Sequence, residues 1–208
     1  MSINLKALEE INSYIQNSKI KLLIVTKTRT EDDIKKLIDL GYRSFGENKV
    51  QEAQKKFSSI NTNTKINLNL IGPLQSNKVK QALSLFDTIQ SVDRIKLVDE
   101  IAKHKDSKFK TSKFFIQINI GKEPQKSGVM PEDFSKLYDY CKNKNLHISG
   151  IMCIPPFDKD PRIFFKKMSS IRDETRSNLI LSMGMSSDYK IAIECDTDEI
   201  RIGSIIFS

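Results

Sequence analysis

The two ends of the chain carry residue types that could act together on one small molecule. Lys27 closes the apolar run 20–26 and offers a primary amine, which either reaches solvent or is presented to a pocket. The segments 182–188 (SMGMSSD) and 201–204 (RIGS) offer hydroxyls and free backbone N–H groups at glycine-containing turns, a combination that suits an anion. Arg201 adds a fixed cation. These residues predict an amine at one edge of a site and a phosphate cradle at the other.

Each of these features has an ordinary structural explanation when it is taken alone. A lysine at the end of a strand usually points to solvent. Gly203 is equally typical of a simple turn, and the SMGMS segment is equally typical of a helix cap. The hypothesis of a site therefore depends on whether the fold brings the three features to one face.

Short β-rich runs alternate with helical apolar spacing along the whole chain. The strands are predicted at residues 20–26, 42–45, 67–71, 88–92, 114–120, 147–154, 178–183 and 199–204. The helices are predicted at residues 4–16, 30–41, 48–57, 77–85, 95–102, 131–141, 161–175 and 187–194. Strands joined by single helices require right-handed crossovers and a parallel sheet, and eight of them close a (β/α)8 barrel. An open doubly wound sheet is the competing fold, but no GxGxxG sequence follows the first strand.

A barrel makes a definite prediction about the site. Such barrels place their sites at the carboxyl ends of the strands, often with phosphate after strands seven and eight, where both glycine segments fall. Side chains alternate along a strand, so Lys27 lies on the same side as Val25. By the same rule Arg201 lies on the same side as Gly203. Since the first and last strands are neighbours in a closed barrel, Lys27 and Arg201 are expected to face each other across one mouth.

The composition indicates one globular domain over residues 1–208. A chain of 208 residues with 38% apolar content is long enough to bury one sizeable core. No apolar run is long enough to span a membrane and residues 1–10 lack the pattern of a secretory signal, so we expect a cytoplasmic protein without membrane contact. Three buried free thiols are predicted, at Cys141, Cys153 and Cys195. His104 and His147 are isolated, and no metal site is expected.

The net charge of +8 raises the hypothesis of a nucleic-acid partner. The lysines, however, occur singly or in pairs such as Lys35–Lys36 and Lys166–Lys167, with Asp and Glu interleaved and no aromatic platform between them. This distribution is typical of a solvated surface. We therefore expect no nucleic-acid partner, and nucleic-acid binding stays a hypothesis that only the net charge motivates.

Eight segments of the chain resemble, in order, those of the pyridoxal phosphate homeostasis proteins, a family related to the N-terminal barrel of alanine racemase. The segments are IVTKT (24–28), FGENKVQEAQKK (45–56), IGPLQSNK (71–78), SVDR (91–94), QINIGKEPQKSGV (117–129), GIMCIPP (150–156), SMGMSSD (182–188) and RIGSIIF (201–207). Together they run nearly from end to end. The resemblance implies a single (β/α)8 TIM barrel with pyridoxal 5′-phosphate (PLP) held as a Schiff base on Lys27.

The resemblance also implies roles for other residues. The expected cofactor-binding set is Lys27, Asn48, Ser182, Met183, Gly184, Ser186, Arg201, Gly203 and Ser204. Phosphate would bind at the turns of the two glycine segments, and Arg201 would approach the pyridine nitrogen. An arginine cannot accept a proton there, so it keeps that nitrogen unprotonated and weakens the ring as an electron sink. The expected function is to store, buffer or deliver PLP without strong catalysis, as a monomer that contacts PLP-dependent apoenzymes only transiently.

The sequence departs from the family pattern at two places, and one alternative function is also considered. Asn69 stands where many relatives have histidine, and the chain stops at Ser208 where relatives usually continue. The last helix is therefore expected to be short or absent, with the extra N-terminal helix covering that edge of the barrel. A PLP-dependent amino-acid racemase is the alternative, but it would need a second acid or base on the opposite face of the ring. Tyr189 is the one tyrosine expected near a strand end.

Overall fold

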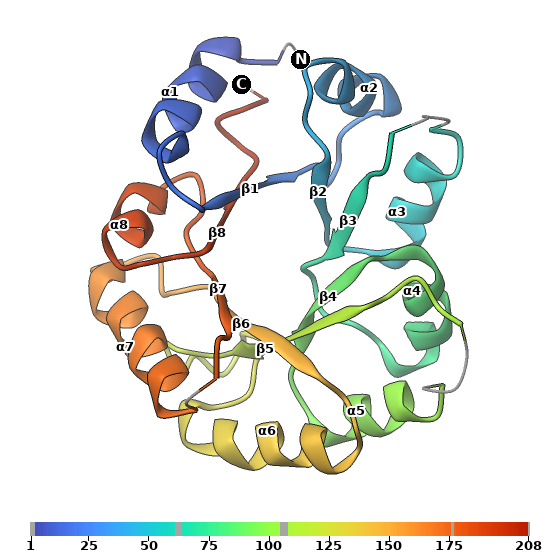
Figure 1. Cartoon of the computed structure of the whole chain (residues 1–208), viewed down its shortest axis with the longest axis vertical. Helices are drawn as coiled ribbons and strands as arrows, with labels where there is room; N and C mark the ends of the chain where they lie inside the picture. The colour runs from blue at the N-terminus through green and yellow to red at the C-terminus, as the bar shows by residue number, and fades with distance from the viewer. Residues whose placement is uncertain (1–2, 61–63, 105–107, 176, 208) are drawn as a thin grey trace.

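Eight parallel strands close into a barrel in the computed structural model, which describes residues 3–60, 64–104, 108–175 and 177–207 (Figure 1). The strands are β1 (Lys21–Val25), β2 (Ser44–Glu47), β3 (Asn67–Leu70), β4 (Thr88–Val92), β5 (Lys113–Ile118), β6 (Ile148–Cys153), β7 (Ile180–Ser182) and β8 (Glu199–Ile202). The α-helices are α1 (Leu5–Ile15), α2 (Glu31–Asp39), α3 (Val50–Phe57), α4 (Val79–Leu85), α5 (Ile95–Ala102), α6 (Phe134–Asn143), α7 (Pro161–Glu174) and α8 (Tyr189–Glu194). Short 3-10 helices, Ser76–Lys78 and Pro131–Asp133, precede α4 and α6. The strands follow one another around the barrel in chain order, so the predicted (β/α)8 fold is confirmed.

The first and last strands form the seam that closes the barrel. Strand β1 pairs with β8 in parallel, and Leu23 is the direct partner of Arg201. Beyond the paired residues the two chains stay close, because a Cβ placed on Gly203 would lie only 3.1 Å from the Cβ of Val25. The carboxyl ends of β1 and β8 therefore share one edge of the barrel, as the sequence predicts.

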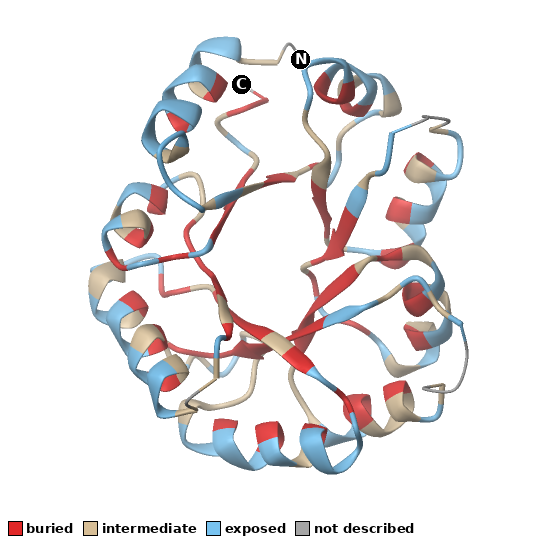
Figure 2. Ribbon diagram, viewed as in Figure 1, coloured by how far each residue is buried: buried red, intermediate tan, exposed pale blue. Residues whose placement is uncertain are grey.

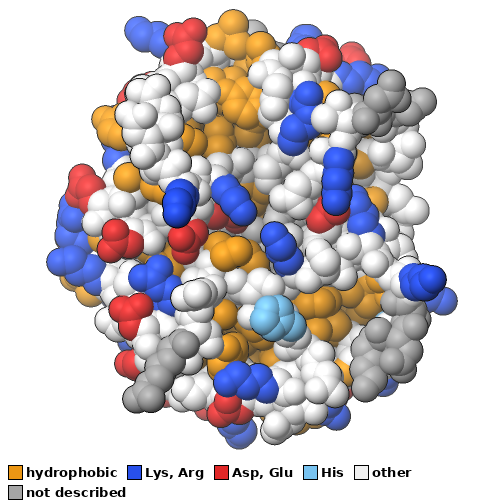
Figure 3. Space-filling view, in the orientation of Figure 1, with side chains coloured by type: hydrophobic (Ala, Val, Ile, Leu, Met, Phe, Trp, Pro, Cys, Tyr) orange, Lys and Arg blue, Asp and Glu red, His pale blue; other side chains and the backbone are white. Residues whose placement is uncertain are grey.

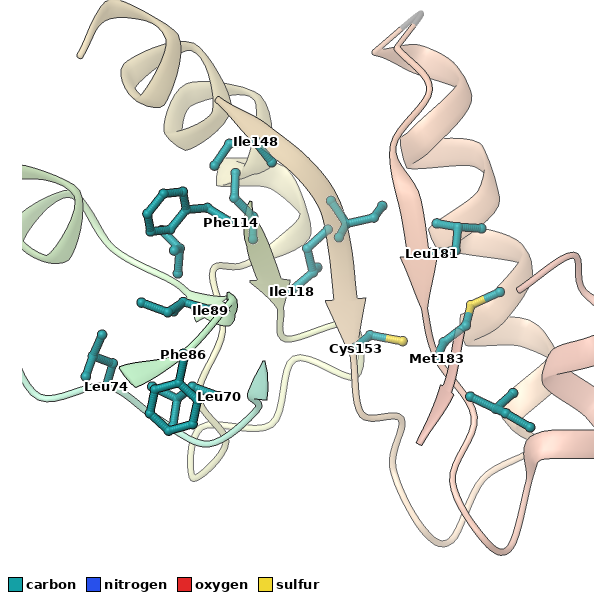
Figure 4. Packing of buried hydrophobic residues seen from close by; sticks show 14 of the residues in the cluster. Leu70, Leu74, Phe86, Ile89, Phe114, Ile118, Ile148, Cys153, Leu181 and Met183 are labelled. Carbon is teal, nitrogen blue, oxygen red and sulfur yellow. The ribbon is translucent and has the colours of Figure 1, made fainter. Parts of the chain in front are cut away.

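The apolar core lies between the strands and the surrounding ring of helices, and Figure 2 shows buried residues on the inner sides of those helices. Strand residues from neighbouring positions in the barrel pack together in this layer. Ile89 of β4 is paired with Phe114 of β5, which is paired with Ile148 of β6, and Figure 4 shows these side chains in one cluster. This packed layer holds the strand ends in fixed positions, which a site built from several strands requires.

Helix α1 lies beside α8 and close to the C-terminal segment (Figure 1). Asn4 caps the helix and its backbone N–H donates to the carbonyl of Ile206 at 2.8 Å. Leu8 and Ile11 bury the inner face of α1, and its Glu10 accepts a hydrogen bond from Lys190 of α8 at 2.8 Å. The N-terminal helix thus covers the β8 side of the seam, as expected. Residues 203–207, which follow β8, form a turn and no helix, and Ser208 lies outside the described residues.

The structure shifts two predicted boundaries next to the site. Strand β2 runs over Ser44–Glu47 instead of 42–45, because Tyr42 still belongs to the turn that ends α2 and donates to Leu37 O at 2.9 Å. Helix α3 begins at Val50 and not at residue 48. Asn48 therefore lies in the loop at the carboxyl end of β2, where it can face a pocket.

The structure also bears on the cysteines, the helices and the metal-binding side chains considered in the sequence. The three cysteines are buried and free, as predicted. In the described part of the chain, none of the helices combines the length and the apolar character needed to cross a membrane. No group of three or more His, Cys, Asp or Glu side chains among the described residues is arranged to hold a metal ion.

Candidate functional site

A pocket of about 660 Å³ opens at the carboxyl ends of the strands. This volume falls within the range of about 300–1,000 Å³ that is typical of small-molecule sites. Six of the nine residues predicted from the sequence line it, namely Lys27, Asn48, Ser186, Arg201, Gly203 and Ser204. The amine, the fixed cation and the two turns thus meet in one cavity.

Lys27 lies in a tight turn immediately after β1. Val25, the last residue of the strand, also lines the pocket, whereas Thr26 is fully buried. The side chain of Lys27 is exposed and lines the pocket. Thr28 then turns the chain away with a φ of 62°, in the left-handed region that β-branched residues rarely adopt. The amine is therefore presented at the mouth of the barrel and is not folded into its interior.

The loops after β7 and β8 are joined to each other at the other edge of the pocket. The backbone N–H of Gly203 donates to Ser186 Oγ at 3.3 Å, and Ser204 follows directly. The loop after β7 is closed by Asp188, whose carboxylate accepts from the N–H of Met185 at 2.6 Å. Burial acts to raise the pKa of Asp188 and outweighs this hydrogen bond. Serine hydroxyls and turn N–H groups thus surround a space that suits a phosphate.

Three predicted residues, Ser182, Met183 and Gly184, do not line this pocket. Ser182 is the last residue of β7 and its hydroxyl lies inside the barrel, 2.8 Å from Gln90 Oε1 and 2.9 Å from Glu199 Oε1. Met183 belongs to the apolar core (Figure 4). Gly184 has a φ of 95°, and a Cβ there would lie 2.6 Å from the Cβ of Ala192 in α8. These three residues therefore lie behind the loop after β7 and not in the pocket lining.

Arg201 forms part of the pocket wall although it is only 3% exposed. Its guanidinium donates to Ser182 Oγ at 2.8 Å and to the carbonyl oxygen of Cys153 at 2.7 Å. Burial lowers the pKa of Arg201 from its ordinary value, and the neighbouring acidic groups oppose that shift. The two hydrogen bonds fix the planar group, which can only donate.

The loop after β5 supplies pocket residues that the sequence reasoning did not select. Lys126 and Ser127 line the pocket together with Gln117. The ammonium group of Lys126 is held by Glu123 Oε2 at 2.5 Å and by the carbonyl of Pro155 at 3.1 Å. These residues lie in the segment 117–129 that carried part of the family resemblance, which was the one signal that could have pointed to them.

Two other residues singled out in the sequence lie away from the cavity. Tyr189 is 5% exposed and packs edge-on against Tyr14, with ring centroids 6.0 Å apart. Asn69 is buried inside the barrel, where its side-chain oxygen accepts from Gln90 Nε2 at 3.1 Å. Neither residue is among those that line the pocket.

Comparison with known proteins identifies the family. A profile of the alanine racemase N-terminal domain matches residues 3–208. The chain is 36% identical over 196 residues to the pyridoxal phosphate homeostasis protein of Aquifex aeolicus, which covers 90% of this chain and 86% of that one. The chain belongs to the pyridoxal phosphate homeostasis protein family. The corresponding protein of Helicobacter pylori is similar over 201 residues at 32% identity, covering 94% of this chain and 90% of that protein.

Solved structures place this family member in the same fold. PipY of Synechococcus elongatus, in a structure with PLP bound, matches with a TM-score of 0.87 at 28% identity and covers 98% of this chain and 99% of PipY. An alanine racemase of Clostridium difficile matches with a TM-score of 0.77 at 16% identity, covering 99% of this chain and 57% of the racemase. The second similarity shows the shared barrel alone.

Proposed function

We propose that this protein holds PLP at the ends of β1, β7 and β8, as a Schiff base on Lys27, and acts in PLP storage, buffering or delivery. The observation that carries the proposal is the convergence of Lys27, Arg201 and the Ser186–Gly203 turn on one pocket. PipY, a relative of almost the same length and fold, has a structure with PLP bound. Family membership and pocket chemistry therefore support the same cofactor.

The residues present fit PLP. A Cβ on Gly203 would lie 3.0 Å from the carbonyl oxygen of Val25, so glycine leaves free the space in which the two loops meet. Ser186 and Ser204, with the neighbouring N–H groups, would hold the phosphate, and Lys27 would hold the other end of the ring. When bound, PLP would supply an aldehyde that condenses with the lysine amine and releases water.

Arg201 and the pocket lining support a binding role in preference to a catalytic one. Its guanidinium would donate toward the pyridine nitrogen and could not return a proton, so it would favour the unprotonated ring. Among the described residues that line the pocket there is no tyrosine, histidine, aspartate or glutamate. The racemase hypothesis needs a second acid or base opposite Lys27, and Tyr189 does not reach the pocket lining. Lys126 does line the pocket, but its ammonium group is held by Glu123 and by the carbonyl of Pro155.

The charge distribution on the one face that is drawn does not favour a nucleic-acid partner. On the face drawn in Figure 3, Lys and Arg side chains are dispersed among acidic, apolar and other groups and do not form one continuous block. Electrostatic binding to nucleic acid requires such a cluster. We propose a monomer that binds PLP and meets PLP-dependent apoenzymes transiently.

Borohydride trapping tests the proposed linkage. Purified protein is mixed with PLP, reduced, digested and analysed by mass spectrometry, alongside Lys27→Ala and Lys21→Ala variants. We expect a visible absorbance band and a reduced adduct on the Lys27 peptide in the unsubstituted protein and in Lys21→Ala, whose lysine lies at the opposite end of β1. Lys27→Ala should lose the adduct and keep weaker binding through the phosphate. Persistence of the full adduct in Lys27→Ala would refute the proposal, and a chiral assay of amino-acid interconversion would reveal a racemase.

A further inference from the structure

Three charged side chains outside the pocket hold the turn that carries Lys27. The ammonium group of Lys56, on α3, donates to the backbone carbonyl of Thr26 at 2.7 Å. The carboxylate of Glu52, one helical turn earlier, accepts from the backbone N–H of Thr28 at 2.5 Å. The peptide groups on both sides of Lys27 are thus each fixed by a charge from the same helix.

Lys56 and the two carboxylates also hold one another. Lys56 Nζ lies 2.6 Å from Glu47 Oε1 and 2.9 Å from Glu52 Oε1. Glu47 Oε1 in turn accepts from the hydroxyl of Thr26 at 2.6 Å. The network therefore links the end of β2, both ends of helix α3 and the end of β1 into one unit.

Charged groups buried this deeply are not expected if they contribute only to the stability of the fold. Glu47 is fully buried, Lys56 is 7% exposed, and Glu47 Oε2 is buried without a hydrogen-bond partner. Burial raises the pKa of Glu47, while the hydrogen bonds from Lys56 and Thr26 oppose that shift. Removing charges from water is costly, and an apolar replacement of a buried ion pair is often as stable. A role in positioning the turn that carries Lys27 explains why charged residues occupy these buried sites.

The turn at residues 26–28 requires stabilising contacts from outside the turn. Thr28 has a φ of 62°, a conformation that a β-branched residue seldom adopts unless its surroundings impose it. The hydrogen bond to Glu52 fixes the N–H of this residue, and the hydrogen bond from Lys56 fixes the carbonyl two residues earlier. Without them the Thr26 carbonyl would keep only its hydrogen bond from the N–H of Arg29, at 3.0 Å, and the peptide group between Lys27 and Thr28 would lose its contact with α3. The amine would then sample directions away from the pocket.

We propose that Lys56, anchored by Glu47 and Glu52, is a positioning residue that aims the amine of Lys27 into the pocket. None of the three charged residues lines that pocket, so they act through the backbone of residues 26–28. The inference rests on the proposed Schiff base at Lys27 and adds the residues that set its geometry. It separates two contributions to binding, the covalent link and the phosphate contacts.

Two ligands distinguish positioning from a general loss of structure. PLP can form the Schiff base, whereas 4′-deoxypyridoxine 5′-phosphate keeps the ring and phosphate but lacks the aldehyde. In Lys56→Met we expect the equilibrium for Schiff-base formation to fall about tenfold, since small misplacements of a reacting group have effects of that order or larger. Binding of the deoxy analogue should stay within about twofold of the unsubstituted protein. Lys55→Met, which removes the same charge from an exposed position on the same helix, should change neither.

Variants of the partly exposed Glu52 test the same inference with less risk to folding. Glu52→Ala should reduce Schiff-base formation, and Glu52→Gln, which keeps an acceptor for the Thr28 N–H, should recover most of it. Equal losses for PLP and for the deoxy analogue, or no loss in Lys56→Met and Glu52→Ala, would overturn the positioning role. An unsubstituted protein that forms no adduct at Lys27 would instead refute the proposed function itself.

Discussion

Substitution of Gly72 tests how closely two loops of the pocket wall are packed, because the loop after β3 passes directly against the backbone of Asn48. A Cβ placed on Gly72 would overlap the carbonyl oxygen of Asn48 and would lie 2.7 Å from its Cα and 2.8 Å from its carbonyl carbon. Carbon atoms in contact normally stay at least about 3.5 Å apart. Gly72→Ala therefore requires the two loops to move apart by roughly 0.8 Å from their present positions. The atoms in the way belong to the backbone, and no change of rotamer relieves the overlap.

The expected cost follows from this displacement. Forcing extra volume into a packed contact typically costs about 1–3 kcal/mol. For a chain of this size that cost lowers the melting temperature by about 2–12 °C. Because Asn48 and Gly72 both line the pocket, the affinity for PLP should fall together with the melting temperature.

Gly46→Ala is the matched control for this substitution. A Cβ on Gly46 of β2 would meet the tips of Ile71 and Leu23 at 3.2 and 3.3 Å, and these side chains can shift slightly. We therefore expect a smaller loss in thermal unfolding, followed by circular dichroism, and in a PLP titration. If Gly72→Ala melts and binds like the unsubstituted protein, or if Gly46→Ala is the more damaging change, the steric reasoning is wrong.

Two further predictions concern stability. Burial raises the pKa of Cys141 and of Cys153 to about 12, so both thiols ionise in the unfolded chain before they ionise in the folded one. Stability should therefore fall as the pH rises from about 9 toward 12, by about 1.4 kcal/mol per thiol at pH 10, and urea unfolding of a Cys141→Ala/Cys153→Ala variant should lose most of this pH dependence. Thr30→Ala removes the reciprocal cap between Thr30 and Asp33 on α2 and should cost about 1 kcal/mol in urea unfolding without changing PLP affinity. An unchanged unfolding midpoint would show that this cap contributes little.

The sequence was sufficient to predict the barrel and the meeting of Lys27 with Arg201, for identifiable physical reasons. The alternation of strands and helices determines a parallel sheet, and a closed sheet makes the first and last strands neighbours. Two-residue periodicity then determines which side chains share a side, and the observed pairing of Leu23 with Arg201 agrees with that rule. Each of these steps depends on local patterns that a single sequence contains.

The remaining parts of the pocket depend on contacts that local patterns do not contain. Ser182 is predicted to bind the cofactor from the end of its strand, yet its pairing with Glu199 keeps it inside the barrel. Lys126 enters the pocket because the loop after β5 folds back on its own strand, where Val129 N donates to Gln117 O at 2.9 Å. Both placements result from long-range register, which no propensity or spacing rule determines.

The position of the site at the seam of the barrel couples ligand binding to the folding of the whole chain. Lys27 follows the first strand and Gly203 follows the last, so the pocket exists only while β1 and β8 remain paired. An unfolded or open chain cannot present the amine and the turns after β7 and β8 together, and a ligand that binds only the closed form stabilises it by mass action. Helix α1 also helps to keep the seam closed, because the hydrogen bond from Asn4 to Ile206 joins the segment before β1 to the segment after β8. Opening of the seam would separate Lys27 from the turns after β7 and β8 and expose the proposed Schiff base to water. Hydrolysis of its C=N bond would return the lysine amine and free PLP, so opening of the seam is a physical route to release.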